Sequence, residues 1–151
     1  MFIRPLHDWI GALIVSLIAL LAFSLGSCQE AHAFTEDEAV RAIIGEDSSS
    51  YEGMYAVACA IRNRGHLKGV YGFRAVRWSN GVLKRYSGAR VSEVIGPNTL
   101  HLAQKAWFES EDGYDVTGGA KHWEGTQFKT PSWASEDSTV IGGNRFYRGV
   151  R

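Results

Sequence analysis

Residues 35–65 read TEDEAVRAIIGEDSSSYEGMYAVACAIRNRG and predict two successive helices. Thr35, with Glu38 three residues later, is typical of a capping box, in which each side chain bonds the backbone N–H of the other residue. The first helix should therefore begin directly after Thr35 and end near Gly45. Its apolar residues are Ala39, Val40, Ala42, Ile43 and Ile44.

The second helix is predicted by a similar start and by a longer apolar pattern. Ser49 and Glu52 predict a second capping box. Residues three and four positions apart form the apolar face: Met54, Val57, Ala58 and Ile61. Smaller residues form an adjoining stripe that another helix could approach: Gly53, Ala56 and Ala60. Gly65 is well placed to end the helix in the left-handed conformation.

The rest of the chain predicts one more helix and several short strands. Residues 68–90 are rich in Gly, Arg and aromatics without a clear period, so we expect loops and one short helix. Pro97 opens a third helix, which should end near Ser110 and place Trp107 in the core. Short extended runs follow at 121–123, 140–141 and 145–147. This order predicts an α+β fold, a small domain with a helical core and short β segments in its C-terminal half.

Length and composition narrow the class of protein. A chain of 151 residues favours one domain, and 45% hydrophobic with 12% aromatic residues favours a globular core. Lys plus Arg and Asp plus Glu both number 16, so the net charge at pH 7 is zero. We therefore expect no nucleic-acid partner, because binding to phosphates needs a surplus of positive charge. An uncharged or mixed-charge polymer remains open as a substrate.

The N-terminal segment predicts export. Arg4 precedes an apolar stretch over residues 9–25, and AHA at 31–33 fits a signal-peptidase site. Residues 1–33 should then lie outside the fold, leaving 34–151 as the mature domain. LGSC at 25–28 also fits a lipobox in which Cys28 carries the lipid, and the apolar stretch is long enough to remain as a membrane anchor. All three routes lead to the periplasm or cell envelope.

The cysteines and histidines do not predict a disulfide, a reactive thiol or a metal site. Cys28 and Cys59 are the two cysteines, so removal or acylation of the leader leaves one thiol and no internal disulfide. Cys59 lies among apolar residues and is expected to be buried and inert. The three histidines of the mature region lack metal-ligand spacing, and no nucleophile-elbow motif occurs. We expect neither a metal nor another cofactor.

Glu46 is the residue expected to carry chemistry. It follows Ile43 by three positions and Ala42 by four, so it continues the apolar stripe if the helix persists. A carboxyl there is partly removed from water, which favours its protonated form. Cleavage of a glycosidic bond needs such a group because the leaving oxygen must receive a proton. Spacing alone leaves open a solvated glutamate at a frayed helix end.

Several motifs occur in an order that resembles a known family. Residues 42–46 read AIIGE, residues 51–58 read YEGMYAVA, and residues 61–64 read IRNR. Later motifs are TGGAKHW at 117–123, PSW at 131–133 and IGGNRFY at 141–147. Over nearly the whole mature domain these resemble the cell-wall hydrolase family that includes the SleB-type spore-cortex lytic enzymes. The first block is the specific part of this resemblance.

The resemblance implies a fold similar to lysozymes and lytic transglycosylases and cleavage between N-acetylmuramic acid and N-acetylglucosamine. By position, Glu46 matches the catalytic glutamate of the family. The loop after Glu46 is one residue shorter than the usual pattern and lacks its second acidic residue. Asn144 replaces a frequent histidine and cannot titrate near neutral pH. Asn63 is expected either to orient the site or to cap the end of its helix.

The mechanism depends on whether Glu46 has a carboxylate partner. Asp47 should point elsewhere, and Glu52 belongs to the predicted capping box. Glu124 is the best of the three candidates, but it is expected in a solvated loop. We therefore expect a lytic transglycosylase, in which Glu46 first protonates the leaving oxygen and then takes the proton of the muramic 6-hydroxyl as a 1,6-anhydro ring closes. The alternatives are a hydrolytic muramidase or glucosaminidase, and a non-catalytic envelope lipoprotein that binds peptidoglycan through the same cleft.

The expected partner is the glycan strand of peptidoglycan, bound by a monomer that meets the membrane only through its N-terminal segment. Sugar rings stack on aromatic faces, which favours Trp123 and Trp133 because both lie in polar stretches containing Gly or Pro. The full set of expected substrate contacts is Tyr51, Asn63, Thr117, His122, Trp123, Trp133, Asn144 and Tyr147.

Overall fold

The computed structural model describes residues 34–150. The predicted signal peptide, lipobox and anchor, including Cys28, therefore lie outside the described residues. Within the described part of the chain, no helix is long and apolar enough to span a bilayer.

Two capped helices open the domain. Helix α2 (Glu36–Glu46) has the predicted capping box, with the Glu38 amide donating to Thr35 Oγ1 at 3.2 Å and the Thr35 amide donating to Glu38 Oε2 at 2.8 Å. Helix α3 (Tyr51–Arg64) ends as predicted at Gly65, which is left-handed with φ 74°. Its predicted capping box is wrong, because Ser50 is the N-cap and accepts from the Gly53 amide at 3.0 Å.

The segment after α3 differs from the expectation of loops. The expected short helix is present as α4 (Gly72–Ala75). A three-stranded antiparallel meander follows, in the order β1 (Val76–Ser79), β2 (Val82–Ser87), β3 (Arg90–Val94). Asn80 and Gly81 form the first turn with φ values of 52° and 72°. An Asn-Gly pair accepts the positive φ that a two-residue hairpin turn requires, so this turn was the sequence sign of the meander.

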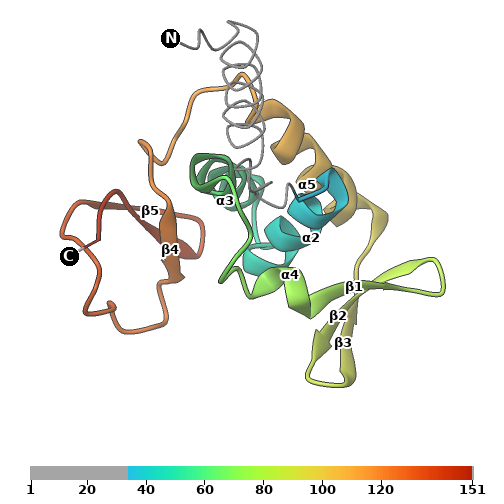
Figure 1. The fold of residues 1–151 in the computed structure, drawn as a ribbon. Coiled ribbons are helices and arrows are strands. Elements are labelled where there is room, and N and C mark those ends of the chain that lie inside the picture. The colour runs from blue at the N-terminus through green and yellow to red at the C-terminus, as the bar shows by residue number, and fades with distance from the viewer. Residues whose placement is uncertain (1–33, 151) are drawn as a thin grey trace, which may run out of the picture. The chain divides into compact units, whose positions relative to one another are not determined.

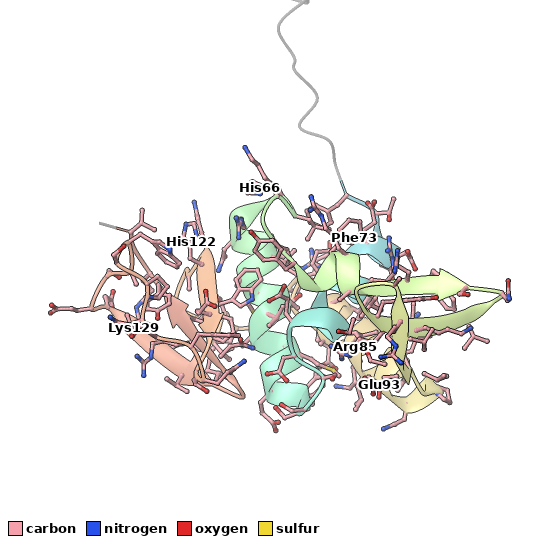
Figure 2. All side chains as sticks on the ribbon, turned by 90° about the horizontal axis from the view of Figure 1, so that it is seen from below. His66, Phe73, Arg85, Glu93, His122 and Lys129 are labelled. Atoms are coloured by element: carbon pink, nitrogen blue, oxygen red, sulfur yellow. The ribbon has the colours of Figure 1, made fainter. Side chains whose placement is uncertain are left out.

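The C-terminal part matches the predicted order. Helix α5 (Pro97–Glu109) begins with Pro97 in its first turn and is capped by Ser110. The second sheet is antiparallel, with strand order β4 (His122–Gly125), β6 (Asn144–Tyr147), β5 (Ser138–Ile141). The two sheets lie on opposite sides of the helices (Figures 1 and 2). The fold class is α+β, as expected.

The core is built from the apolar faces of α2, α3 and α5. Its largest fully buried side chains are Ile43, Ile44, Met54, Val57, Ile61, Val76 and Phe146. Trp107 is half-buried against this cluster beneath the Arg62 guanidinium, whose carbon lies 3.8 Å from the ring centroid. Cys59 is a buried free thiol, and burial raises its pKa. Gly53 faces the Asp47 carboxylate, since a Cβ there would lie 2.1 Å from Oδ2.

Candidate functional site

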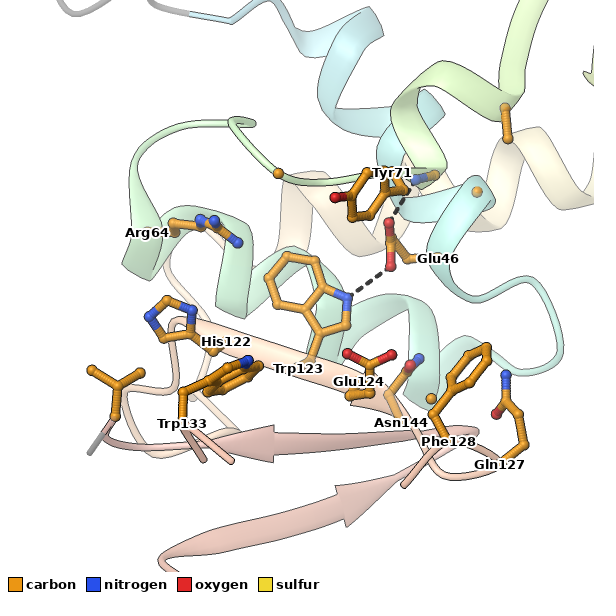
Figure 3. A pocket seen from close by; sticks show the side chains of 16 residues that line it. Glu46, Arg64, Tyr71, His122, Trp123, Glu124, Gln127, Phe128, Trp133 and Asn144 are labelled. Atoms are coloured by element: carbon orange, nitrogen blue, oxygen red, sulfur yellow. Dashed lines mark hydrogen bonds between the residues drawn. The ribbon is translucent and has the colours of Figure 1, made fainter. Parts of the chain in front are cut away.

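A cleft of about 930 Å³ lies between the helical part and the second sheet (Figure 3). The ends of α2 and α3, the start of α4 and strand β4 form its walls. Its lining includes Glu46, Arg64, Tyr71, Gly72, His122, Trp123, Glu124, Gln127, Phe128, Trp133 and Asn144.

Glu46, the last residue of α2, is half-buried in this cleft. Its Oε1 accepts from the Gly72 amide at 2.6 Å, and its Oε2 accepts from the Trp123 indole N–H at 3.0 Å. The donors come from α4 and β4, so both walls hold the same carboxyl group (Figure 3). A carboxyl held in this way and open to a cleft can give or take a proton with fixed geometry.

Two glycines bring the start of α4 against the end of α2. A Cβ on Gly45 would lie 2.1 Å from the carbonyl oxygen of Gly72, and a Cβ on Gly72 would lie 2.6 Å from the Glu46 nitrogen. Both distances are far inside van der Waals contact, so a side chain at either position would push the two backbones apart. The close approach is what allows the Gly72 amide to reach Glu46.

Arg85 on β2 holds the C-terminal end of α2 from the other side. Its guanidinium donates to the carbonyl of Ile44 at 2.9 Å and to that of Gly45 at 3.3 Å, and it pairs with Glu93 at 2.9 Å (Figure 2). Carbonyls of the last helical turn have no partner within the helix, and a cation there also interacts favourably with the helix dipole. The first sheet therefore anchors the helix end that carries Glu46.

Asp47 joins α2 to the second sheet. It is 6% exposed; its Oδ1 accepts from the amide and hydroxyl of Ser49 at 2.9 and 2.6 Å. Its Oδ2 accepts from the Gly143 amide at 3.2 Å and the Asn144 amide group at 3.4 Å. Four donors thus occupy the Asp47 carboxylate, which gives it a structural task beside the cleft.

Aromatic and imidazole rings form the opposite wall. The ring centroids of His122 and Trp133 are 5.5 Å apart, and those of Trp133 and Tyr147 are 5.4 Å apart. Burial lowers the pKa of His122, and the positive charges of Arg64, His66 and Lys121 lower it further. His122 is therefore neutral at pH 7.

The structure brings some of the expected site residues together and separates others. Glu46, His122, Trp123, Trp133 and Asn144 line one cleft. The others lie outside its lining: Tyr51, Asn63, Thr117 and Tyr147.

Those four residues have other surroundings. The Tyr51 hydroxyl donates to Glu109 and lies between α3 and α5. The Asn63 side chain donates to Asp115 at 2.9 Å and to the Ala120 carbonyl at 3.2 Å, so it binds a loop and does not cap its helix. Thr117 is fully buried in that loop, and Tyr147 is buried against Trp133.

Four cleft residues with aromatic or charged side chains were not among the expected site residues: Arg64, Tyr71, Glu124 and Phe128. Tyr71 and Phe128 are 77% and 60% exposed, unusual for such large apolar rings, but neither follows a periodic pattern. Glu124 was expected in a solvated loop and instead lies half-buried on β4, with no hydrogen-bond or ion-pair partner among residues 34–150. Arg64 was named only as part of the IRNR motif, because the neighbouring residues in the sequence do not indicate that the end of α3 lines a cleft.

Within residues 34–150, no group of three or more His, Cys, Asp or Glu side chains is arranged to hold a metal ion.

No protein-family model matches the chain, and a search of curated proteins finds no match. Among solved structures, the chain is similar to one described as the catalytic domain of the Bacillus cereus SleB protein. The sequence identity is 21%, the likeness covers 77% of this chain and 93% of that chain, and the TM-score is 0.47.

Proposed function

We propose that this protein is an exported enzyme that cleaves the glycan strand of peptidoglycan, with Glu46 as its proton donor. The observation that supports it most is the position of Glu46, whose carboxyl is held from both walls of a cleft lined by exposed aromatic rings. Aromatic faces bind the apolar faces of sugars, and a fixed carboxyl can protonate the oxygen of a glycosidic bond.

We propose that the reaction is that of a lytic transglycosylase. Glu46 gives its proton to the bridging oxygen while the bond from that oxygen to C1 of the muramic acid breaks. The resulting carboxylate then accepts the proton of the 6-hydroxyl as O6 bonds to C1, which closes a 1,6-anhydro ring and restores the acid. One residue serves both steps, in keeping with Asp47 being occupied by four donors.

Hydrolysis is the second candidate, and Glu124 is the observation that favours it. Its carboxylate, which has no partner in the described part of the chain, lines the same cleft as Glu46 and could activate a water molecule. Mass spectrometry of digested sacculi separates the two reactions. The transglycosylase yields 1,6-anhydromuramic ends, one water lighter than the reducing ends that a hydrolase yields. Reducing ends that disappear in a Glu124→Gln variant would replace our proposal with hydrolysis.

The test of the catalytic role is Glu46→Gln, which keeps the shape of the side chain but cannot donate the same proton. We expect cleavage of purified sacculi to fall by at least about a hundredfold, the low end of general acid catalysis. Glu52→Gln is the matched control, since Glu52 is exposed on α3 outside the cleft. A non-catalytic binding protein would pull down sacculi without releasing fragments in any variant.

Peptidoglycan lies outside the cytoplasmic membrane, so the proposed function requires export. The predicted leader over residues 1–33 would supply it, with lipidation at Cys28 as one route. Fractionation of cells that make the full chain, followed by N-terminal analysis, tests this proposal. A mature end at Phe34 would indicate signal-peptidase cleavage, an acylated Cys28 would indicate a lipoprotein, and recovery from the cytoplasm would contradict export.

A further inference from the structure

The two ends of the cleft differ in charge. Figure 3 shows Arg64 and His122 toward one end of the cleft, the carboxylates of Glu46 and Glu124 nearer its middle, and the uncharged side chains of Gln127 and Phe128 at the other end. The positive charges of Arg64 and Lys121 act on His122. The end that holds Arg64 therefore has a positive potential, although the whole chain carries no net charge.

Arg64 is a cation that has no anionic partner among residues 34–150. Its Nη2 donates to the Lys68 carbonyl at 2.6 Å, and its guanidinium carbon lies 5.9 Å from the Trp123 ring centroid. Its Nε is buried and has no hydrogen-bond partner among residues 34–150. No ion pair joins it to Glu46 or to any other carboxylate of the described region, whereas other arginines there do form ion pairs: Arg41, Arg62, Arg85 and Arg148.

The surroundings of Arg64 make this state costly. A guanidinium has five N–H donors, and a charged donor that loses water without gaining a partner destabilises the folded protein. Burial accordingly lowers the pKa of Arg64, although the negative charge of Glu46 acts in the opposite direction. Gly65 turns the chain back over the side chain, so that Gly69 lies close to Nη2. An arginine placed in this way is suited to receive an anion that enters the cleft.

We infer that Arg64 binds a carboxylate of the substrate, so that the cleft selects an anionic glycan over a neutral one. This inference rests on the proposed function. The muramic acid of peptidoglycan carries a lactyl carboxyl group, which is either free or extended by a peptide stem that has carboxylates of its own. Either source offers two oxygens to the planar guanidinium, whose geometry favours a bidentate contact.

The experiment measures binding to three preparations of glycan strands, with the protein in its Glu46→Gln form so that the strands stay intact. The first preparation keeps its peptide stems. In the second, an amidase has removed the stems and exposed the lactyl carboxylates. In the third, carbodiimide coupling has converted all carboxylates to neutral methylamides.

We expect the amidated strands to bind about 10- to 100-fold more weakly than a carboxylate-bearing preparation, the range of a hydrogen bond to a charged group. Addition of Arg64→Gln should abolish this difference, and Arg64→Lys should restore part of it because the charge returns without the bidentate geometry. Arg90→Gln removes an exposed arginine of β3 outside the cleft and should keep the full difference. Tighter binding to the first or the second preparation identifies the source of the carboxylate.

Equal binding of the Arg64-containing protein to native and amidated strands would overturn the inference. So would an equal loss in the Arg64→Gln and Arg90→Gln variants, which would indicate a general effect of surface charge. Cleavage by the unmodified protein is scored separately. Strands that bind with the expected preference but are never cut would refute the proposed catalysis and leave carboxylate recognition supported.

Discussion

Replacing Trp123 with Phe removes one of the two hydrogen bonds to Glu46 and keeps an aromatic ring in place. The lost donor is the indole N–H, 3.0 Å from Oε2. A hydrogen bond to a charged group contributes about 1.5–3 kcal/mol. Negative charge develops on Glu46 as its proton leaves, so this bond is stronger in the transition state than before it. We therefore expect kcat to fall about 10- to 100-fold.

The measurement is the initial rate of fragment release from purified sacculi at saturating substrate, with the folded fraction checked by circular dichroism. Trp78→Phe is the matched control. Trp78 donates its indole N–H to an exposed carboxylate, that of Asp37 at 2.7 Å, and lies outside the cleft lining. The control should keep its kcat within about twofold.

A Trp123→Phe protein that is folded and keeps its kcat within twofold would refute the reasoning, because the indole donor would then make no contribution to proton transfer. An equal fall in both variants would point to a general effect of the exchange. A fall confined to KM would assign Trp123 to sugar binding instead.

Three further perturbations test how Glu46 and its cleft are held. Arg85→Gln removes the charged donor at the end of α2, and denaturant unfolding should show a loss of about 1.5–3 kcal/mol; an unchanged midpoint would contradict the capping role. Gly72→Ala should cost about 1–3 kcal/mol of folding free energy and lower activity, since its Cβ would lie 2.6 Å from the Glu46 nitrogen. A Cβ at Gly96 meets no atom of residues 34–150 within 4 Å, so Gly96→Ala should be tolerated in both assays. The lowered pKa of His122 means that the imidazole binds a proton more readily in the unfolded chain than in the folded one, so the free energy of unfolding should fall as the pH drops below about 6.5. His122→Gln should reduce that fall, as measured by unfolding curves at pH 7.5 and 5.5. An identical pH dependence in the two proteins would contradict this assignment.

Much of the fold could be predicted because the residues that determine each helix end lie close to that end in the sequence. The capping box of Thr35 and the glycine at 65 fix helix ends within a few residues of where they occur. The meander was missed because its strands are short and largely exposed, so their side chains lack the alternation of apolar and polar residues. Its one local indicator was the Asn80-Gly81 turn.

The site was less predictable because its contacts join distant parts of the chain. Glu46 could be singled out from its place at the end of an apolar stripe and from the resemblance. Its donor Trp123 is 77 positions away, and Arg85 is 40 positions from the carbonyl of Gly45 that it caps. Asn63 binds partners more than 50 positions away, which no helical pattern could indicate.

The meeting of Gly45 and Gly72 has a consequence for how this protein can change. Main-chain atoms alone set the spacing between the end of α2 and the start of α4, since no side chain separates them. Substitutions of the surrounding side chains can therefore reshape what the cleft admits while the acid stays where it is. Changes in the aromatic and charged side chains of the cleft can therefore alter which substrates bind. The condition is that positions 45 and 72 remain glycine, because a Cβ at either position would not fit.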